Sequence, residues 1–131
     1  EGLYYKPFSR FFEKITIYKV LEMICTDLHL DRFLEVFMRE KEIEKRLVAE
    51  VKRNGGICPK FVSPGYSGMP DRIILLPKGK IAFAELKAPG QKPRPLQVAR
   101  HKILMGLGFR VYVIDGTEQI GGVIHEIKNS V

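Results

Sequence analysis

The chain has 131 residues, of which 45% are hydrophobic and 28% are charged, and its formal net charge is +7. This is the composition of an ordinary globular domain, which excludes a largely disordered chain, and no apolar run approaches the roughly 18 residues that a membrane span needs. The charge is uneven, because residues 41–131 hold 16 Lys and Arg against 8 Asp and Glu, and this part therefore favours a polyanionic partner such as nucleic acid.

Cysteine and histidine residues are few and scattered along the chain. The two cysteines and three histidines match neither a disulfide framework nor the ligand spacing of a zinc site. The N-terminus lacks the charged and then apolar pattern of a signal peptide. We therefore expect a protein of a reducing compartment, cytoplasmic or nuclear, without a membrane.

Residues 1–37 differ in character from the rest, since they carry eight of the 13 aromatic residues. Apolar residues recur at helical spacing over residues 15–28 and again over 30–37, which predicts two short helices. We expect a helical N-terminal extension at 1–37, which is a packing appendage, a dimerisation element or part of a larger parent protein. A separate domain is expected at 38–131.

Residues 38–131 predict an alternation of helices and strands. Gly55 and Gly56 end the first helix, and Pro95 suits the first position of the second. The predicted elements are a helix over 40–54, strands over 57–62, 72–76 and 81–87, a helix over 95–107, a strand over 109–115 and a short helix over 123–127. This order predicts an α/β fold in which a central mixed sheet of about four strands is flanked by helices.

The hairpin over residues 72–87 carries the most informative residues. A three-residue loop with a left-handed Gly79 would pair Leu76 with Lys80. Counting outward from this pair, Asp71 faces Glu85, and Lys87 lies on the same face of the sheet. Both faces of this hairpin are otherwise apolar. Two carboxylates and one ammonium at the end of a dry sheet suit a hard divalent cation beside a phosphate, which is the apparatus of metal-assisted phosphodiester hydrolysis.

Plainer interpretations of these residues exist. Asp71 follows Pro70, and Pro-Asp usually initiates a turn. Glu85 and Lys87 alone would form an ordinary salt bridge on an exposed strand. The facing position of Asp71 and Glu85, between two covered faces, favours the metal site because buried charges require partners.

The helix over 40–54 supplies a further candidate carboxylate. Its apolar stripe consists of Ile43, Leu47, Val48 and Val51, and Glu44 falls within this stripe rather than on the wet face. We favour a metal-site role for Glu44 over pairing with a solvent lysine. Glu40, one turn earlier, is the competitor.

In the helix over 95–107 we expect Leu96, Ile103 and Leu107 to form the buried stripe, with Gln97, His101 and Leu104 along one flank. Gln97 lies near the N-terminus of the helix, where free N–H groups and the helix dipole favour anions, so a phosphate is a candidate ligand there. His101 lies on this flank, and we predict no role for it. The candidate phosphate contacts are basic residues around these segments: Lys60, Arg72, Lys92, Arg94, Arg100 and Lys102.

The ordered set of motifs resembles a known family. A helix with Glu44 that ends at Gly55-Gly56, then Gly-Met-Pro-Asp71, then Glu85-Leu86-Lys87, then Pro-Leu-Gln97 on a helix, resembles the PD-(D/E)xK nuclease superfamily and, more narrowly, the VRR-NUC domain. The resemblance covers roughly residues 40–115 and says nothing about residues 1–37.

The resemblance implies a restriction-endonuclease-like fold and a metal-dependent endonuclease acting on DNA. Asp71, Glu85 and the Leu86 carbonyl would hold Mg²⁺ or Mn²⁺, with Glu44 as a further ligand, while Lys87 and Gln97 would orient water and phosphate. It also implies a homodimer that cuts branched DNA, as Holliday junction resolvases do. The alternatives are a flap-cutting or restriction-type nuclease, and a non-catalytic DNA-binding module.

Overall fold

The computed structural model describes residue 17 and residues 28–131. Val36–Val131 form one compact unit, and the fold described below is that of this unit. Apart from residues 17 and 28, the helix expected over residues 15–28 lies outside the described residues. The two helices expected over 30–37 and 40–54 are one continuous helix, α2 (Leu28–Arg53). Within the described part of the chain, no helix is both long enough and apolar enough to cross a membrane.

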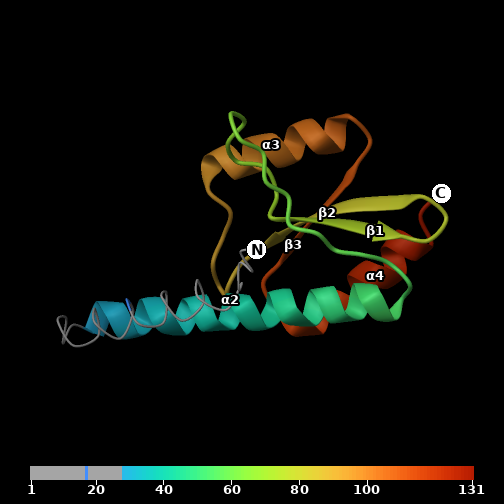
Figure 1. The fold of residues 1–131 in the computed structure, drawn as a ribbon. Helices are drawn as coiled ribbons and strands as arrows, with labels where there is room; N and C mark the ends of the chain where they lie inside the picture. Colours follow the sequence, from blue (N-terminus) through green and yellow to red (C-terminus); the bar gives the residue numbers. More distant parts are fainter. Residues whose placement is uncertain (1–16, 18–27) are drawn as a thin grey trace, which may run out of the picture. The chain divides into compact units, whose positions relative to one another are not determined.

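The sheet has three strands in the order β1-β2-β3 (Figure 1). β1 (Arg72–Leu76) pairs antiparallel with β2 (Lys80–Leu86), and β3 (Arg110–Ile114) pairs parallel with β2. Leu76 lies opposite Lys80, which confirms the predicted register. The hairpin turn uses two left-handed residues, Lys78 (φ 66°) and Gly79 (φ 71°), rather than the glycine alone.

The strand expected over residues 57–62 is absent from the described fold, so the prediction of about four strands is corrected to three. The segment still runs beside β1, because Ile57 and Leu75 exchange two backbone hydrogen bonds of 2.9 Å. At the next position Ile73 N–H donates to the Pro59 carbonyl at 3.1 Å, but Pro59 has no N–H to return the bond. Pro59 thereby interrupts the ladder.

The core lies between one face of the sheet and helices α2 and α4. Figure 1 shows these two helices on one side of the sheet and α3 (Pro95–Gly106) on the other. α4 (Ile120–Lys128) begins three residues earlier than expected and follows the short 3₁₀ helix η1 (Thr117–Gln119). The predicted stripe of α2 is confirmed, with Val48 partly buried. The largest fully buried hydrophobic side chains of this core are Leu47, Val51, Ile74, Ile114 and Ile127.

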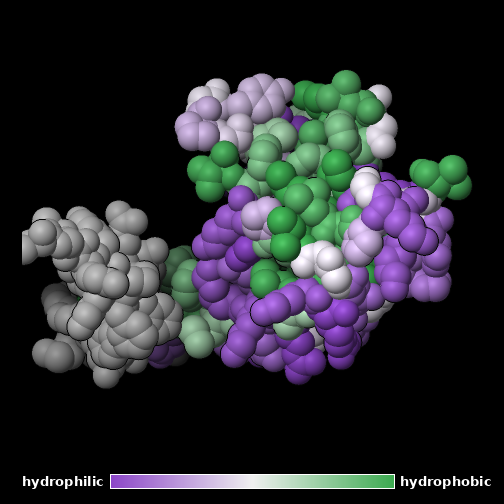
Figure 2. Space-filling model, turned by 45° about the vertical axis from the view of Figure 1, so that its right-hand side comes forward, coloured by the Kyte–Doolittle hydropathy of each residue, from purple (hydrophilic) through white to green (hydrophobic). Residues whose placement is uncertain are grey.

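Helix α3 begins at Pro95 as predicted, but the prediction of its buried face is wrong. Leu96, Ile103 and Leu107 are 47%, 46% and 69% exposed. The buried residues of the helix are Gln97, His101 and Leu104. These three also recur at helical spacing, so they share one face of the helix. The polar contacts of Gln97 described below place this face against the sheet. In Figure 2, green hydrophobic residues lie at the upper right of the view and continue toward its centre, beside weakly hydrophilic residues at the upper left.

Candidate metal-binding site at the end of the hairpin

The two hairpin carboxylates lie side by side at the start of β1 and the end of β2. Arg72 is opposite Ala84, and this register continues to Asp71 beside Glu85. Asp71 accepts a hydrogen bond at its Oδ2 from the backbone N–H of Leu86, at 2.9 Å. The fully buried Pro70 precedes Asp71 and fixes the entry of the chain into β1. The sheet register therefore positions both carboxylates.

Glu85 is fully buried, and its carboxylate contacts Lys87, which follows β2, and side chains of α3. Oε1 accepts a hydrogen bond from Gln97 Nε2 at 2.7 Å, and the Lys87 ammonium lies 3.0 Å from the same oxygen. Oε2 lies 3.6 Å from His101 Nε2. Among the described residues neither Oε2 nor this Nε2 has a hydrogen-bond partner. Oε1 thus has two partners, Gln97 and Lys87, whereas Oε2 has no hydrogen-bond partner among the described residues.

Burial and a second negative charge make Glu85 hard to ionise in the absence of a cation. Its pKa is raised to about 7: burial is the largest cause, the neighbouring Asp71 adds to the rise, and Lys87 opposes it. Burial also lowers the pKa of His101, so the imidazole favours its neutral form. A bound divalent cation would favour ionised Glu85, since it offsets both the burial and the repulsion from Asp71.

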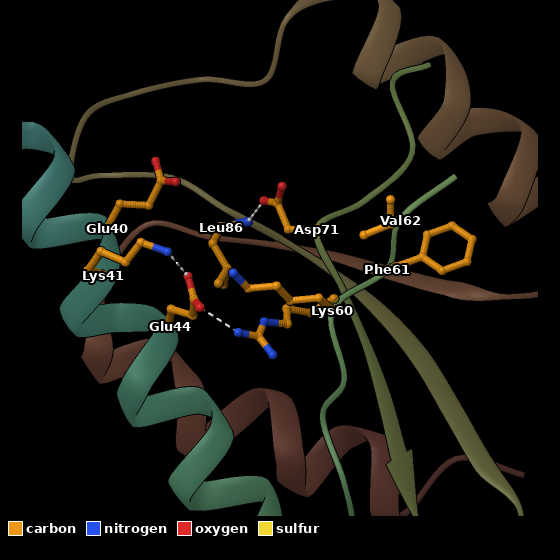
Figure 3. A pocket seen from close by; sticks show the side chains of 9 residues that line it. Glu40, Lys41, Glu44, Lys60, Phe61, Val62, Asp71 and Leu86 are labelled. Carbon is orange, nitrogen blue, oxygen red and sulfur yellow. Dashed lines mark hydrogen bonds and ion pairs between the residues drawn. The ribbon is translucent and has the colours of Figure 1, made fainter. Parts of the chain in front are cut away.

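A cavity of about 220 Å³ opens beside Asp71 (Figure 3). Three of its lining residues, Glu40, Lys41 and Glu44, come from α2. The others come from the segment beside β1 and from the hairpin: Lys60, Phe61, Val62, Asp71, Arg72 and Leu86. The predicted Glu44, Asp71 and Leu86 therefore line one cavity, whereas Glu85 does not line it and instead contacts Gln97 and His101 of α3.

Glu44 is engaged by cations of the chain itself. It forms an ion pair with Arg72 and another with Lys41, whose Nζ lies 2.9 Å from Oε2 (Figure 3). Burial alone would raise the pKa of Glu44, but Lys41 and Arg72 outweigh this effect and hold it lower than usual. Arg72 also donates to the Cys58 carbonyl at 2.8 Å, which anchors the pair.

Glu40 has the charge neighbours of a site residue. Burial raises its pKa first, and the negative charge of Asp71 raises it further while Lys87 lowers it. Glu40 thus interacts with the hairpin charges of Asp71 and Lys87 as well as with Lys41 and Glu44 of its own helix, whereas the charge neighbours of Glu44 are Lys41 and Arg72. The predicted role of Glu44 stays a prediction, and Glu40 is a helix carboxylate whose charge interacts with that of Asp71.

The oxygen-rich donor set fits a hard divalent cation. Asp71 and Glu85 offer carboxylate oxygens, and Glu85 Oε2 is a buried oxygen without a partner among the described residues. No three Asp, Glu, His or Cys side chains in the described ranges already converge as ligands of one ion. An ion held here would therefore complete its coordination with the Leu86 carbonyl, water or a shifted α2 carboxylate.

The remaining candidate DNA contacts lie in different places. Lys60 and Arg72 line the cavity, whereas Lys92, Arg94 and Lys102 are exposed around α3. Their predicted contacts with DNA remain predictions.

Arg100 has a structural role that the sequence did not reveal. Its guanidinium lies 3.9 Å from the centre of the Tyr66 ring, and its Nε donates to the Ser67 carbonyl at 2.9 Å. Gly68 is pressed against the same helix, because a Cβ there would lie 2.8 Å from Leu96 Cγ. The loop that leads to Asp71 is thereby tied to α3.

The mixed sheet, the helices on both of its faces and the paired hairpin carboxylates define a PD-(D/E)xK-like fold. No family model matches the chain. In sequence, the chain is 54% identical over 81 residues to "Putative nuclease p44" of Acyrthosiphon pisum secondary endosymbiont phage 1. The aligned residues cover 62% of this chain and 87% of that protein. In structure, it is similar to a solved VRR-NUC domain, with a TM-score of 0.63, 31% identity, and coverage of 66% of this chain and 95% of the other. The chain belongs to the VRR-NUC family.

Proposed function

We propose that the chain is a metal-dependent endonuclease that hydrolyses DNA phosphodiester bonds. The observation that carries this proposal is the position of Asp71 beside Glu85, with the Lys87 ammonium 3.0 Å from Glu85 Oε1. A member of this family that keeps both carboxylates and the lysine has the groups that phosphodiester hydrolysis requires. A purely DNA-binding module, the alternative, has no use for acids facing a phosphate.

Each residue has a distinct part in the proposed reaction. Asp71, Glu85 and the Leu86 carbonyl would hold Mg²⁺ or Mn²⁺, with Glu44 or Glu40 as a further ligand. The ion, when bound, supplies an activated water and offsets negative charge on the phosphate. Lys87 would orient the attacking water and stabilise the developing charge. Gln97 would position the water or phosphate, although its amide is bonded to Glu85 in the free protein.

The proposed substrate is branched DNA. Residues 41–131 carry a net charge of +8, and Lys60 lines the cavity beside Asp71, where it would meet a phosphate. A Holliday junction or a similar four-way structure is the first candidate. A flap or a linear restriction-type site, cut by the same residues, is the second.

We expect cleavage of at least one DNA structure in Mg²⁺ or Mn²⁺ and none in excess EDTA. Ca²⁺ should permit DNA binding but little turnover, because its coordination is loose. The measurement incubates the protein with labelled four-way junction, flap, linear duplex and single-stranded DNA under each ion condition. Full activity in EDTA would contradict the metal dependence, and cleavage of flaps alone would contradict the junction preference.

A homodimer is the proposed active species. Resolving a junction requires two cuts, and one chain carries one Asp71/Glu85/Lys87 group, so a two-fold dimer supplies the second site in matching symmetry. The exposed apolar outer face of α3, made by Leu96, Ile103 and Leu107, supports association there, since such patches usually mark interaction sites.

We expect light scattering to give twice the mass of the chain for the wild type. Ile103→Glu combined with Leu107→Glu should give monomers, because the two new charges of each chain would be buried against those of its partner across a two-fold contact. Lys102→Glu is the control for added negative charge on the same helix. A wild-type monomer that cuts one strand of a flap and leaves junctions intact would refute the dimer while preserving the nuclease.

A further inference from the structure

His101 is a buried titratable residue that the proposed reaction does not use. It lies on the inner face of α3, one turn after Gln97, and it is 5% exposed. A spacing of four residues places both side chains on the same face of the helix, so both point toward Glu85 in β2. Buried histidines are uncommon enough that the partner of each deserves an explanation.

The two oxygens of Glu85 differ in their partners. Oε1 has Gln97 Nε2 at 2.7 Å and Lys87 Nζ at 3.0 Å. Oε2 faces His101 Nε2 at 3.6 Å, and both of these atoms are buried without a hydrogen-bond partner among the described residues. Leaving two such atoms unsatisfied is costly, and an N–H between them would satisfy both at once. An approach of about 0.7 Å would bring the pair to hydrogen-bond distance.

We propose that His101 is a positioning residue for Glu85. The Nε2–H of His101 donates to Glu85 Oε2, so that two side chains of α3 hold both oxygens of the carboxylate. This inference rests on the proposed function, because it assigns to Glu85 the role of a metal ligand. With Gln97 on Oε1 and His101 on Oε2, the plane of the carboxylate is fixed. A ligand that is already oriented loses less freedom when it binds an ion, which is how outer-shell partners raise metal affinity.

A simpler role for His101 is to fill space between α3 and the sheet. That role needs bulk but no donor, and an aromatic ring without nitrogen would perform it equally well. The two roles therefore differ in how the protein responds to a side chain that keeps the volume and loses the N–H group.

The test compares His101→Phe, which keeps the ring and loses the donor, with His101→Gln, which keeps an N–H at a similar reach. Met105→Ala, an exposed change on the same helix, is the control. The affinity for Mn²⁺ is measured without DNA by electron paramagnetic resonance of the free ion. We expect His101→Phe to bind Mn²⁺ at least about tenfold more weakly, while His101→Gln recovers most of the loss and Met105→Ala equals the wild type.

A second measurement does not depend on the nuclease proposal. Long-range ¹H–¹⁵N spectra of the metal-free protein report which ring nitrogen of His101 carries the proton. We expect a proton on Nε2, and we expect Glu85→Gln to shift this nitrogen signal.

Three results would overturn the inference. These are unchanged Mn²⁺ affinity in His101→Phe, an equal loss in His101→Gln and His101→Phe, or a ring signal that ignores Glu85→Gln. If the wild type neither binds Mn²⁺ nor cleaves DNA, the proposed function fails, and the ring spectra still decide whether His101 holds Glu85.

Discussion

Replacing Asp71, Glu85 or Lys87 with alanine should abolish DNA cleavage while DNA binding is retained. Each change removes either an oxygen that would hold the ion or the ammonium 3.0 Å from Glu85 Oε1. Losing one such group typically lowers the rate by about 10²–10³-fold, and losing an ion ligand should cost more. Removing a carboxylate beside a phosphate also removes repulsion, so binding should if anything become tighter.

Cleavage and gel-shift measurements on the same preparations separate the two effects. Glu42→Ala, which removes an exposed carboxylate from α2, is the matched control and should behave as the wild type. Any alanine variant of the three that keeps a near-wild-type rate would remove that residue from the site. A variant that loses cleavage and DNA binding together would instead indicate a damaged fold.

The stability of the metal-free protein should fall as the pH rises through neutrality, because Glu85 is buried. Its pKa is about 7 in the folded protein and near 4.5 in the unfolded chain, chiefly because of burial and then Asp71. A group whose pKa is raised by folding contributes stability below its unfolded pKa and loses it as the pH passes its folded pKa. The free energy of unfolding should begin to fall near pH 4.5 and reach its full loss above pH 7, and the expected loss is about 3 kcal/mol.

Urea unfolding of the metal-free protein at several pH values measures this loss. Glu85→Gln keeps the shape of the side chain without the titration, so the difference between variant and wild type isolates the effect of Glu85 from other titrating groups. Parallel pH profiles for the two proteins would refute the assignment. Added Mg²⁺ should reduce the loss in the wild type, because an ion that binds the folded state stabilises it.

The parts of the fold that sequence predicted best are those governed by local rules. The hairpin register follows from the left-handed turn at Gly79, and once it is fixed, Asp71 must lie beside Glu85. The apolar stripe of α2 follows in the same way from helical periodicity. These rules depend only on residues near one another in the chain.

The parts that sequence predicted wrongly depend on distant partners. The face that α3 buries is selected by the Gln97 contact with Glu85, twelve positions away, against the apolar pattern of Leu96 and Ile103. The segment that begins at Ile57 runs beside β1, but Pro59 lacks the N–H that a full strand needs. Pairing of Glu44 with Arg72, 28 positions away, also lies beyond any local pattern.

The small number of apolar side chains that α3 buries has a consequence for thermal inactivation. The helix buries one apolar side chain, Leu104, alongside Gln97 and His101, so it shares little of the core between α2, α4 and the sheet. Elements with few buried apolar contacts open locally at a lower free energy than the whole fold. Opening of α3 would release Glu85 from Gln97 and also free the loop that leads to Asp71 from Arg100. On warming, the site should therefore disassemble while most of the secondary structure persists.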